Sequence, residues 1–212
     1  MITIHHLGVS QSDRVVWLME ELGLPYELKW YNRGEDFLAP AELRALHPVG
    51  TAPVITDGDL VMAESTAIVE YISRKYGGGE LSVDPDDPDY ANYLFWMQFN
   101  NSFQSALFMK MAYQAGGGDL TQGGQVVDVM QRREGGLYDY LEQRLGESEY
   151  LGADRFTCAD IMSMFNLTSL EMLGARPIDE KLPNTLAYVA RVSSRPAYQK
   201  AMSIAGPAAT AP

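Results

Sequence analysis

The chain has 212 residues, of which 46% are hydrophobic and 21% are charged, a composition that excludes a disordered or fibrous protein and predicts a globular one. Its 28 acidic and 16 basic residues give a formal net charge of −12, which disfavours binding to nucleic acid and to anionic membranes. No apolar run approaches the roughly 18 residues that a membrane span needs. We therefore expect a small ligand or a soluble partner, with no nucleic acid and no membrane.

The N-terminus and the cysteine content predict a cytoplasmic location. The segment from Met1 to Leu7 has neither the basic start nor the uninterrupted apolar stretch of a secretory signal. The single cysteine, Cys158, excludes an internal disulfide and a multi-cysteine metal cage. A reducing compartment suits both observations.

Strand and helix patterns alternate along the first 80 residues. Strands are predicted where apolar residues alternate with polar ones, and helices where apolar residues recur every three or four positions. The pair Asp57-Gly58 favours a hairpin turn between the last two strands. The predicted order is βαβαββα, with strands over 2–7, 26–31, 53–56 and 60–62 and helices over 12–22, 37–46 and 64–76.

The second half of the sequence has no strand pattern. A Gly-, Pro- and Asp-rich stretch over 77–89 resembles a linker, which predicts an α/β domain over 1–80, a linker over 81–89 and an all-helical domain over 90–212. Thr157, with Asp160 three residues later, predicts the capped start of a buried helix. The other helices are predicted over 90–115, 126–145 and 186–202.

The turn after the first predicted strand carries two hydroxyls, Ser10 and Ser12, at the start of a helix. Free backbone amides and the positive end of the dipole stabilise an anion there, including a thiolate. Ser12 suits an N-cap that bonds to its own helix, whereas Ser10 is freer to face a ligand. Cys158 is expected to be a buried structural thiol.

A second candidate site combines Thr51-Ala52-Pro53 with Glu64-Ser65. A proline at the mouth of a strand is often cis, and it exposes the preceding backbone amide and carbonyl for pairing with a peptide. At a helix start an acid can hold an ammonium group while the dipole holds a carboxylate. A short zwitterionic peptide suits these groups; the alternative is a kinked turn followed by an ordinary helix.

Two other kinds of site are disfavoured. His5 and His6 are neighbours on a strand and point to opposite faces, so they cannot readily share a metal ion. The glycine triplets lack the Lys-Ser/Thr pair of a phosphate-binding loop. We expect neither a metal nor a nucleotide.

Taken together, several motifs resemble those of the cytosolic glutathione transferase family, in a bacterial, serine-type form, over nearly the whole chain. They are Ser10 in the first turn, the run from Arg14 to Glu27, His47-Pro48-Val49-Gly50-Thr51-Ala52-Pro53-Val54, Glu64-Ser65-Thr66-Ala67-Ile68 and Thr157-Cys158-Ala159-Asp160-Ile161. The resemblance implies a thioredoxin-like N-terminal domain that holds glutathione, an all-helical C-terminal domain with a pocket for a hydrophobic co-substrate, and a homodimer.

The resemblance also implies roles for individual residues. Glu64 and Ser65 match the clamp on the γ-glutamyl group, and Ala52, before the family's cis-proline at Pro53, matches the residue that pairs with the cysteinyl unit. Many relatives have Lys where this chain has Thr51. In place of that lysine, His47 or Arg14 would hold the glycyl carboxylate.

The proposed chemistry places a hydrogen bond from Ser10, with Ser12 as the other candidate, on the sulfur of glutathione. That bond and the helix dipole would lower the pKa of the thiol and raise the amount of thiolate. An apolar electrophile would then rest on the aromatic stripe of the first C-terminal helix, for which core packing is the competing role. The residues expected to line the pocket are Phe95, Phe99, Phe103 and Tyr113, and Trp96 and Phe108 belong to the same stripe.

The predicted activity is the transfer of glutathione to a hydrophobic electrophile. Two alternatives stay open: a glutathione-dependent lyase, peroxidase or disulfide-bond reductase on the same scaffold, and a non-catalytic protein that binds glutathione.

Overall fold

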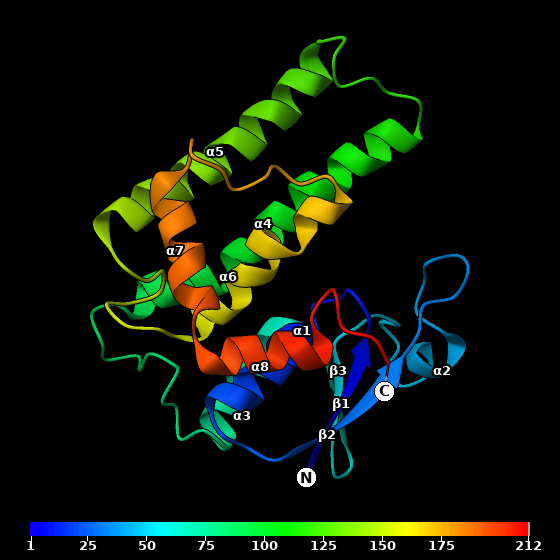
Figure 1. Cartoon of the computed structure of the whole chain (residues 1–212), viewed down its shortest axis with the longest axis vertical. Helices are drawn as coiled ribbons and strands as arrows, with labels where there is room; N and C mark the ends of the chain where they lie inside the picture. The colour runs from blue at the N-terminus through cyan, green and yellow to red at the C-terminus, as the bar shows by residue number, and fades with distance from the viewer. Residues whose placement is uncertain (212) are drawn as a thin grey trace.

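The computed structural model describes residues 1–211, without the side chains of Met172 and Leu173; Pro212, the last residue of the predicted helical half, lies outside that description. The strands are β1 (Ile2–Leu7), β2 (Tyr26–Tyr31), β3 (Val54–Asp57) and β4 (Leu60–Ala63). The helices are α1 (Asp13–Glu21), α2 (Ala41–Arg44), α3 (Ser65–Lys75), α4 (Tyr90–Ala115), α5 (Gln125–Glu147), α6 (Cys158–Thr168), the 3₁₀ helix η1 (Leu170–Leu173), α7 (Pro183–Ser193) and α8 (Pro196–Ala205). The predicted βαβαββα order and the helical second half are confirmed (Figure 1).

The four strands form one mixed sheet in the order β2-β1-β3-β4. Strand β1 pairs in parallel with β2 and antiparallel with β3, which pairs antiparallel with β4. Because side chains alternate across a strand, Ile2 and Ile4 face the core under α1 and α3, whereas Leu7 packs with Leu43 of α2 on the other face. This is the predicted thioredoxin-like arrangement, and its alternation places His6 on the α1 side of the sheet.

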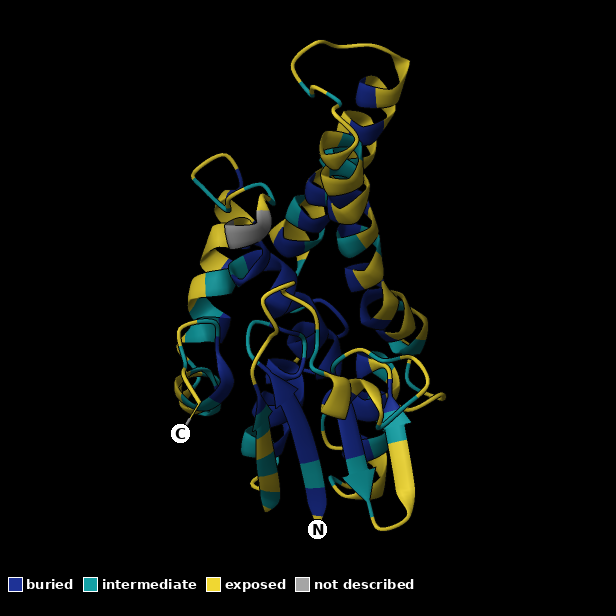
Figure 2. Ribbon diagram, turned by 90° about the vertical axis from the view of Figure 1, so that its right-hand side faces the viewer, coloured by how far each residue is buried: buried dark blue, intermediate teal, exposed yellow. Residues whose placement is uncertain are grey.

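In the helical half, α4 and α5 run side by side and are joined by a glycine-rich loop (Figure 1). Exposed residues dominate at the end of this pair that carries the loop, whereas α6 is buried along almost its whole length (Figure 2). Helix α6 begins with the predicted capping box. Thr157 Oγ1 accepts a hydrogen bond from the Ala159 amide at 3.3 Å, and Asp160 Oδ2 accepts one from the Thr157 amide at 2.8 Å.

Helix α1 joins the two halves. Every residue from Asp13 to Met19 is buried, and α1 packs against β1, α3, α6 and α8. Glu21, at the end of α1, accepts two hydrogen bonds of 2.7 Å from Arg195 at the start of α8. One apolar cluster therefore extends from Ile2 to Ala205 through both halves.

Three details differ from the sequence-based expectations. The helix predicted over 37–46 is only Ala41–Arg44, because Arg33 bonds the carbonyls of Gly8, Val9 and Phe37 and holds the preceding loop in an irregular path. The stretch predicted over 186–202 is two helices, since Pro196 disfavours helical geometry at the residue before it. The segment over 77–89 is held in place, with Ser82 and Val83 buried and the Leu81 carbonyl accepting from the Cys158 amide at 2.8 Å.

Candidate functional site

The turn between β1 and α1 holds both predicted hydroxyls in one hydrogen-bonded group. Ser10 Oγ and Ser12 Oγ lie 2.6 Å apart, and the Ser12 amide donates to Ser10 Oγ at 3.3 Å. Ser12 is completely buried, whereas Ser10 keeps 8% of its surface exposed. The structure therefore brings the two serines together, with Ser10 nearer to solvent.

The prediction that the Ser12 side chain caps α1 is wrong. Ser12 occupies the N-cap position, but its hydroxyl makes no capping hydrogen bond. It turns toward β1 instead, where it accepts from the Leu7 amide at 3.2 Å and lies 2.8 Å from His6 Nδ1. The strand offers this hydroxyl two partners, which replace the amides of the helix.

A cavity of about 140 Å³ lies beside this turn, where the N-terminal half meets α4. The Ala52–Pro53 peptide is cis, as predicted, and both residues line the cavity together with Thr51. Glu64 and Ser65 line it from the start of α3, and Gln11, Asn101 and Gln104 complete it. The second candidate site thus forms one concave polar surface.

Glu64 has an unusual backbone conformation, with a φ of 72° directly before α3. A left-handed conformation is costly for a residue other than glycine and persists only where the surrounding structure imposes it. It exposes the Glu64 side chain, while the following Ser65 is buried. Such strain is typical of functional sites.

Behind the cavity, Arg14 joins Ser65 to Gln11. Arg14 Nη1 donates to Ser65 Oγ at 3.2 Å and to Gln11 Oε1 at 2.5 Å, and Ser65 Oγ donates to Gln11 Oε1 at 3.1 Å. These contacts fix the serine at the start of α3 against the turn that precedes α1. Arg14 therefore supports Ser65 and makes no contact with Thr51.

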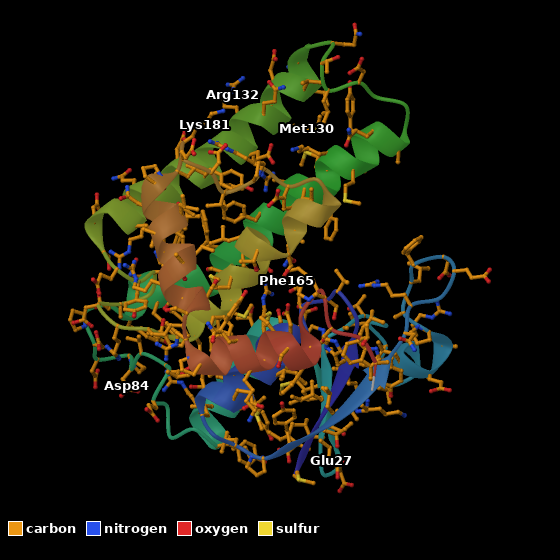
Figure 3. All side chains as sticks on the ribbon, in the orientation of Figure 1. Glu27, Asp84, Met130, Arg132, Phe165 and Lys181 are labelled. Atoms are coloured by element: carbon orange, nitrogen blue, oxygen red, sulfur yellow. The ribbon has the colours of Figure 1, made fainter. Side chains whose placement is uncertain are left out.

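Arg14 is itself 1% exposed, and its Nε and Nη2 have no hydrogen-bond partner among the described residues. Its guanidinium carbon lies 5.3 Å from the centre of the Phe165 ring. Phe165, labelled in Figure 3, is in the last turn of α6. Burial lowers the pKa of Arg14 to about 10 and raises the pKa of the neighbouring Asp13 to about 7. Two unsatisfied donors of Arg14 are therefore buried behind Ser65.

Helix α4 closes the cavity from the helical half. Gln104 Oε1 accepts from Gln11 Nε2 at 3.1 Å, which bridges the two halves, and Gln104 Nε2 lies 3.4 Å from Asn166 Oδ1 of α6. Beyond Gln104, Leu107 packs with Phe165 and Leu170. Phe108 and Met111, one and two turns further along the face of Gln104, are exposed. The polar cavity thus adjoins an apolar surface.

The four aromatic residues predicted to line a pocket lie elsewhere on α4. Phe99 and Phe103 are buried in the main core, and Phe103 packs against Tyr138 of α5 at 5.0 Å between ring centres. Phe95 contacts Trp96, Phe99 and Tyr140, and Tyr113 lies against the loop at Gly118. None of the four lines the cavity beside Ser65, because helical spacing turns them toward α5.

The remaining predicted residues are also placed. His47 does not line the cavity, and its Nδ1 accepts a hydrogen bond from the Val49 amide at 3.2 Å. Cys158 is fully buried, as predicted, and burial raises the pKa of its thiol to about 12. His5 bonds to Tyr31 while His6 bonds to Ser12, so the two histidines do point to opposite faces.

Two further features are absent from residues 1–211. Within that range, no three or more His, Cys, Asp and Glu side chains come together as metal ligands would. Among the same residues, no helix is long and apolar enough to span a bilayer.

Sequence reasoning missed three polar residues of this region: His6, Gln11 and Gln104. Gln11 lies between Ser10 and Ser12, but a single glutamine forms no sequence pattern that indicates a ligand-binding residue. Gln104 stands among aromatic residues on a long helix, and its position opposite Gln11 depends on how the halves pack. His6 was considered only as a metal ligand.

The sheet and the cavity beside its cis-proline define a thioredoxin-like domain joined to a helical half. Residues 10–75 match the N-terminal domain of glutathione S-transferases, and residues 101–196 match their C-terminal domain. The chain is 30% identical to glutathione S-transferase 3 of Schizosaccharomyces pombe, over 93% of this chain and 85% of that protein.

Two solved structures are also similar. A glutathione S-transferase from Actinobacillus pleuropneumoniae is 34% identical, with a TM-score of 0.85 over 97% of this chain and 93% of that chain. The theta class glutathione S-transferase from the citrus canker pathogen Xanthomonas axonopodis pv. citri, solved with glutathione bound, is 26% identical, with a TM-score of 0.70 over 97% of this chain and 98% of that chain. The chain belongs to the glutathione S-transferase family and is accordingly a transferase enzyme.

Proposed function

We propose that this enzyme binds glutathione in the cavity beside Ser65 and transfers its thiolate to a hydrophobic electrophile, a reaction that serves detoxification. The observation that carries the proposal is the convergence of the cis Ala52–Pro53 peptide, Glu64 and Ser65 on one polar cavity next to the start of α1. These groups come from three separate segments of the sequence. Their chemistry suits a small peptide that carries an ammonium group, two carboxylates and a free backbone.

The γ-glutamyl and cysteinyl parts of glutathione each have a matching group. The exposed carboxylate of Glu64 would hold the γ-glutamyl ammonium group, and the Ser65 amide at the start of α3 would hold the γ-glutamyl carboxylate. The backbone of Ala52 is free to pair with the cysteinyl unit. Thr51 lines the cavity at the end proposed for the glycyl carboxylate. Neither residue predicted to replace a lysine at that end is in contact with it: Arg14 is bonded to Ser65, and His47 lies outside the cavity.

Ser10 is the group that activates the sulfur. It adjoins Gln11 of the cavity wall and precedes α1, whose first amides add a partial positive charge. A hydrogen bond from its hydroxyl favours the thiolate over the thiol and lowers the pKa. The single cysteine of the chain is buried away from the cavity, which favours conjugation over an exchange that uses a protein thiol.

The electrophile would lie on the apolar surface that adjoins the cavity. Phe108 and Met111 extend the face of α4 that carries Gln104, and Phe165 borders it from α6. Of the predicted aromatic stripe this placement keeps Phe108, whereas the predicted pocket residues Phe95, Phe99, Phe103 and Tyr113 do not line the cavity. The two placements are separable by mutation.

A homodimer is also part of the proposal. A hollow of about 490 Å³ opens between α3 and α4 and is lined by Glu64, Ala67 and Leu94, of which Leu94 is an exposed apolar residue. An exposed hollow with apolar neighbours is a surface that a second copy of this chain can cover.

Replacing Ser10 tests the activation of the thiol. Ser10→Ala removes the donor, so the pKa of bound glutathione should rise by about one unit, a tenfold loss of thiolate near pH 7. Glutathione affinity should change little, because the clamp lies at Glu64 and Ser65. Ultraviolet absorbance of the thiolate, followed against pH, measures the shift. An unchanged pKa would remove Ser10 from the mechanism.

Replacing Glu64 tests the clamp. Glu64→Ala should weaken glutathione binding by about 1.5–3 kcal/mol, the usual range for a hydrogen bond to a charged group. Calorimetric titration measures the change. Glu80→Ala, which removes an exposed acid between α3 and α4, is the matched control and should bind like the wild type. Equal affinities for the two variants would exclude Glu64 from the site.

Replacing aromatic residues on the two faces of α4 locates the electrophile. Phe108→Ala should raise the KM for an aromatic electrophile severalfold, since the loss of a large apolar contact costs about 1–3 kcal/mol, while the KM for glutathione stays unchanged. Phe95→Ala is the comparison on the other face. A larger effect of Phe95→Ala would move the pocket to the predicted aromatic cluster.

Sedimentation equilibrium at micromolar concentration tests the homodimer. We expect a species of twice the 23.5 kDa chain mass. A single species of 23.5 kDa would refute the dimer.

A further inference from the structure

Ser10 does not stand alone in the β1–α1 turn, because it ends a chain of three hydrogen-bonding groups. His6 Nδ1 lies 2.8 Å from Ser12 Oγ, and Ser12 Oγ lies 2.6 Å from Ser10 Oγ. Either serine can be the donor in the second contact. The direction of these bonds decides whether the Ser10 hydroxyl proton is available to a ligand.

His6 is held in one position. It is completely buried on the α1 side of β1, and its ring centre lies 4.3 Å from that of Trp30 on β2. Among the described residues its Nε2 has no hydrogen-bond partner, so Nδ1 is the only ring nitrogen with one. A neutral imidazole carries one N–H group. A proton on Nδ1 has an acceptor in Ser12, whereas a proton on Nε2 would be a buried donor without one.

The lone pairs of Ser12 Oγ also indicate that the hydrogen bonds run from His6 through Ser12 to Ser10. Its oxygen accepts from the Leu7 amide at 3.2 Å, and a hydroxyl oxygen has two lone pairs. If His6 Nδ1–H fills the second, the Ser12 hydroxyl has two acceptors, Ser10 Oγ at 2.6 Å and the Leu7 carbonyl oxygen at 3.5 Å, and the shorter contact makes Ser10 the acceptor. Ser10 Oγ then accepts from the hydroxyl and the amide of Ser12, and its own proton stays free. In the opposite direction Ser10 donates to Ser12 and loses the proton that the sulfur needs.

We infer that His6, as the neutral Nδ1–H tautomer, is a positioning residue that acts through Ser12 to direct the Ser10 hydroxyl toward the glutathione sulfur. The inference rests on the proposed function, because it assigns to Ser10 the role given above. Successive donors in one direction also polarise each other, which strengthens the last bond to the anion. Ser12 is the middle member of this relay and does not itself touch the ligand.

His6 does not act as a base in this arrangement. Protonation would place a charge in a fully buried ring and a second N–H at Nε2, where the described residues offer no acceptor. The same burial lowers the pKa of His6 to about 4. The ring stays neutral near pH 7, and only the direction of its N–H matters.

The tautomer can be observed directly in the wild-type enzyme. The chain has three histidines, so protein labelled with ¹⁵N in the imidazole rings gives a simple two-bond ¹H–¹⁵N spectrum. In the complex with glutathione, His6 should show a protonated Nδ1 and an unprotonated Nε2. A proton on Nε2 would overturn the inference whatever the activity of the enzyme.

Variants test the effect on the sulfur. His6→Leu removes the donor and Ser12→Ala removes the middle hydroxyl. Each should reduce the thiolate of bound glutathione at pH 7 roughly three- to tenfold, with affinity for glutathione retained. His6→Asn places an amide nitrogen near the position of Nδ1 and should restore most of the thiolate. The double variant His6→Leu with Ser12→Ala should lose no more than either single variant, because both interrupt the same relay.

The outcomes separate the relay from the proposed function. If wild-type enzyme fails to lower the pKa of glutathione, or if Ser10→Ala leaves that pKa unchanged, the proposed role of Ser10 falls and the relay falls with it. If Ser10→Ala raises the pKa while folded His6→Leu and Ser12→Ala do not, the relay alone is overturned. Additive losses in the double variant would also contradict a single relay.

Discussion

The burial of α1 is the constraint on which the rest of the structure depends. A helix covered by β1, α3, α6 and α8 has no face left for water, so even Asp13 and Arg14 in its first turn are buried. The turn before such a helix cannot move independently, and its serines are held in a fixed relation to the strand. The β1–α1 turn is therefore held by its packing and hydrogen bonds, and the cavity beside it is lined mainly by polar residues.

Much of the fold follows from local patterns. Strand β2 and helix α4 have the predicted bounds, and Thr157 with Asp160 starts α6 as the spacing indicates. These elements are predictable because their signals are short-range: alternation, helical periodicity and a side chain that bonds amides three residues away. The predicted length of helix α2 was too great because the loop before it is held by Arg33. The Arg33 guanidinium binds carbonyls of a turn about 24 residues earlier in the chain, a contact that no local pattern indicates.

The candidate site could be predicted only in part, and for a physical reason. Sequence spacing located Ser10, Ala52, Pro53, Glu64 and Ser65, since each stands at the end of a strand or the start of a helix. It could not show which way the Ser12 hydroxyl turns, because the helix amides and β1 both offer partners. Nor could it separate the faces of α4, where aromatic residues are so frequent that periodicity does not distinguish a core ring from a ligand contact.

The contact between α1 and α8 has a consequence for the order of synthesis. Glu21 and Arg195 are 174 residues apart, so α8 leaves the ribosome long after α1, the helix that it covers. Until α8 is made, the side of α1 that carries Trp17 lacks its contact with Tyr198. The N-terminal half thus reaches its final packing only after α8 has been translated, and a chain that stalls before α8 exposes an apolar side of α1.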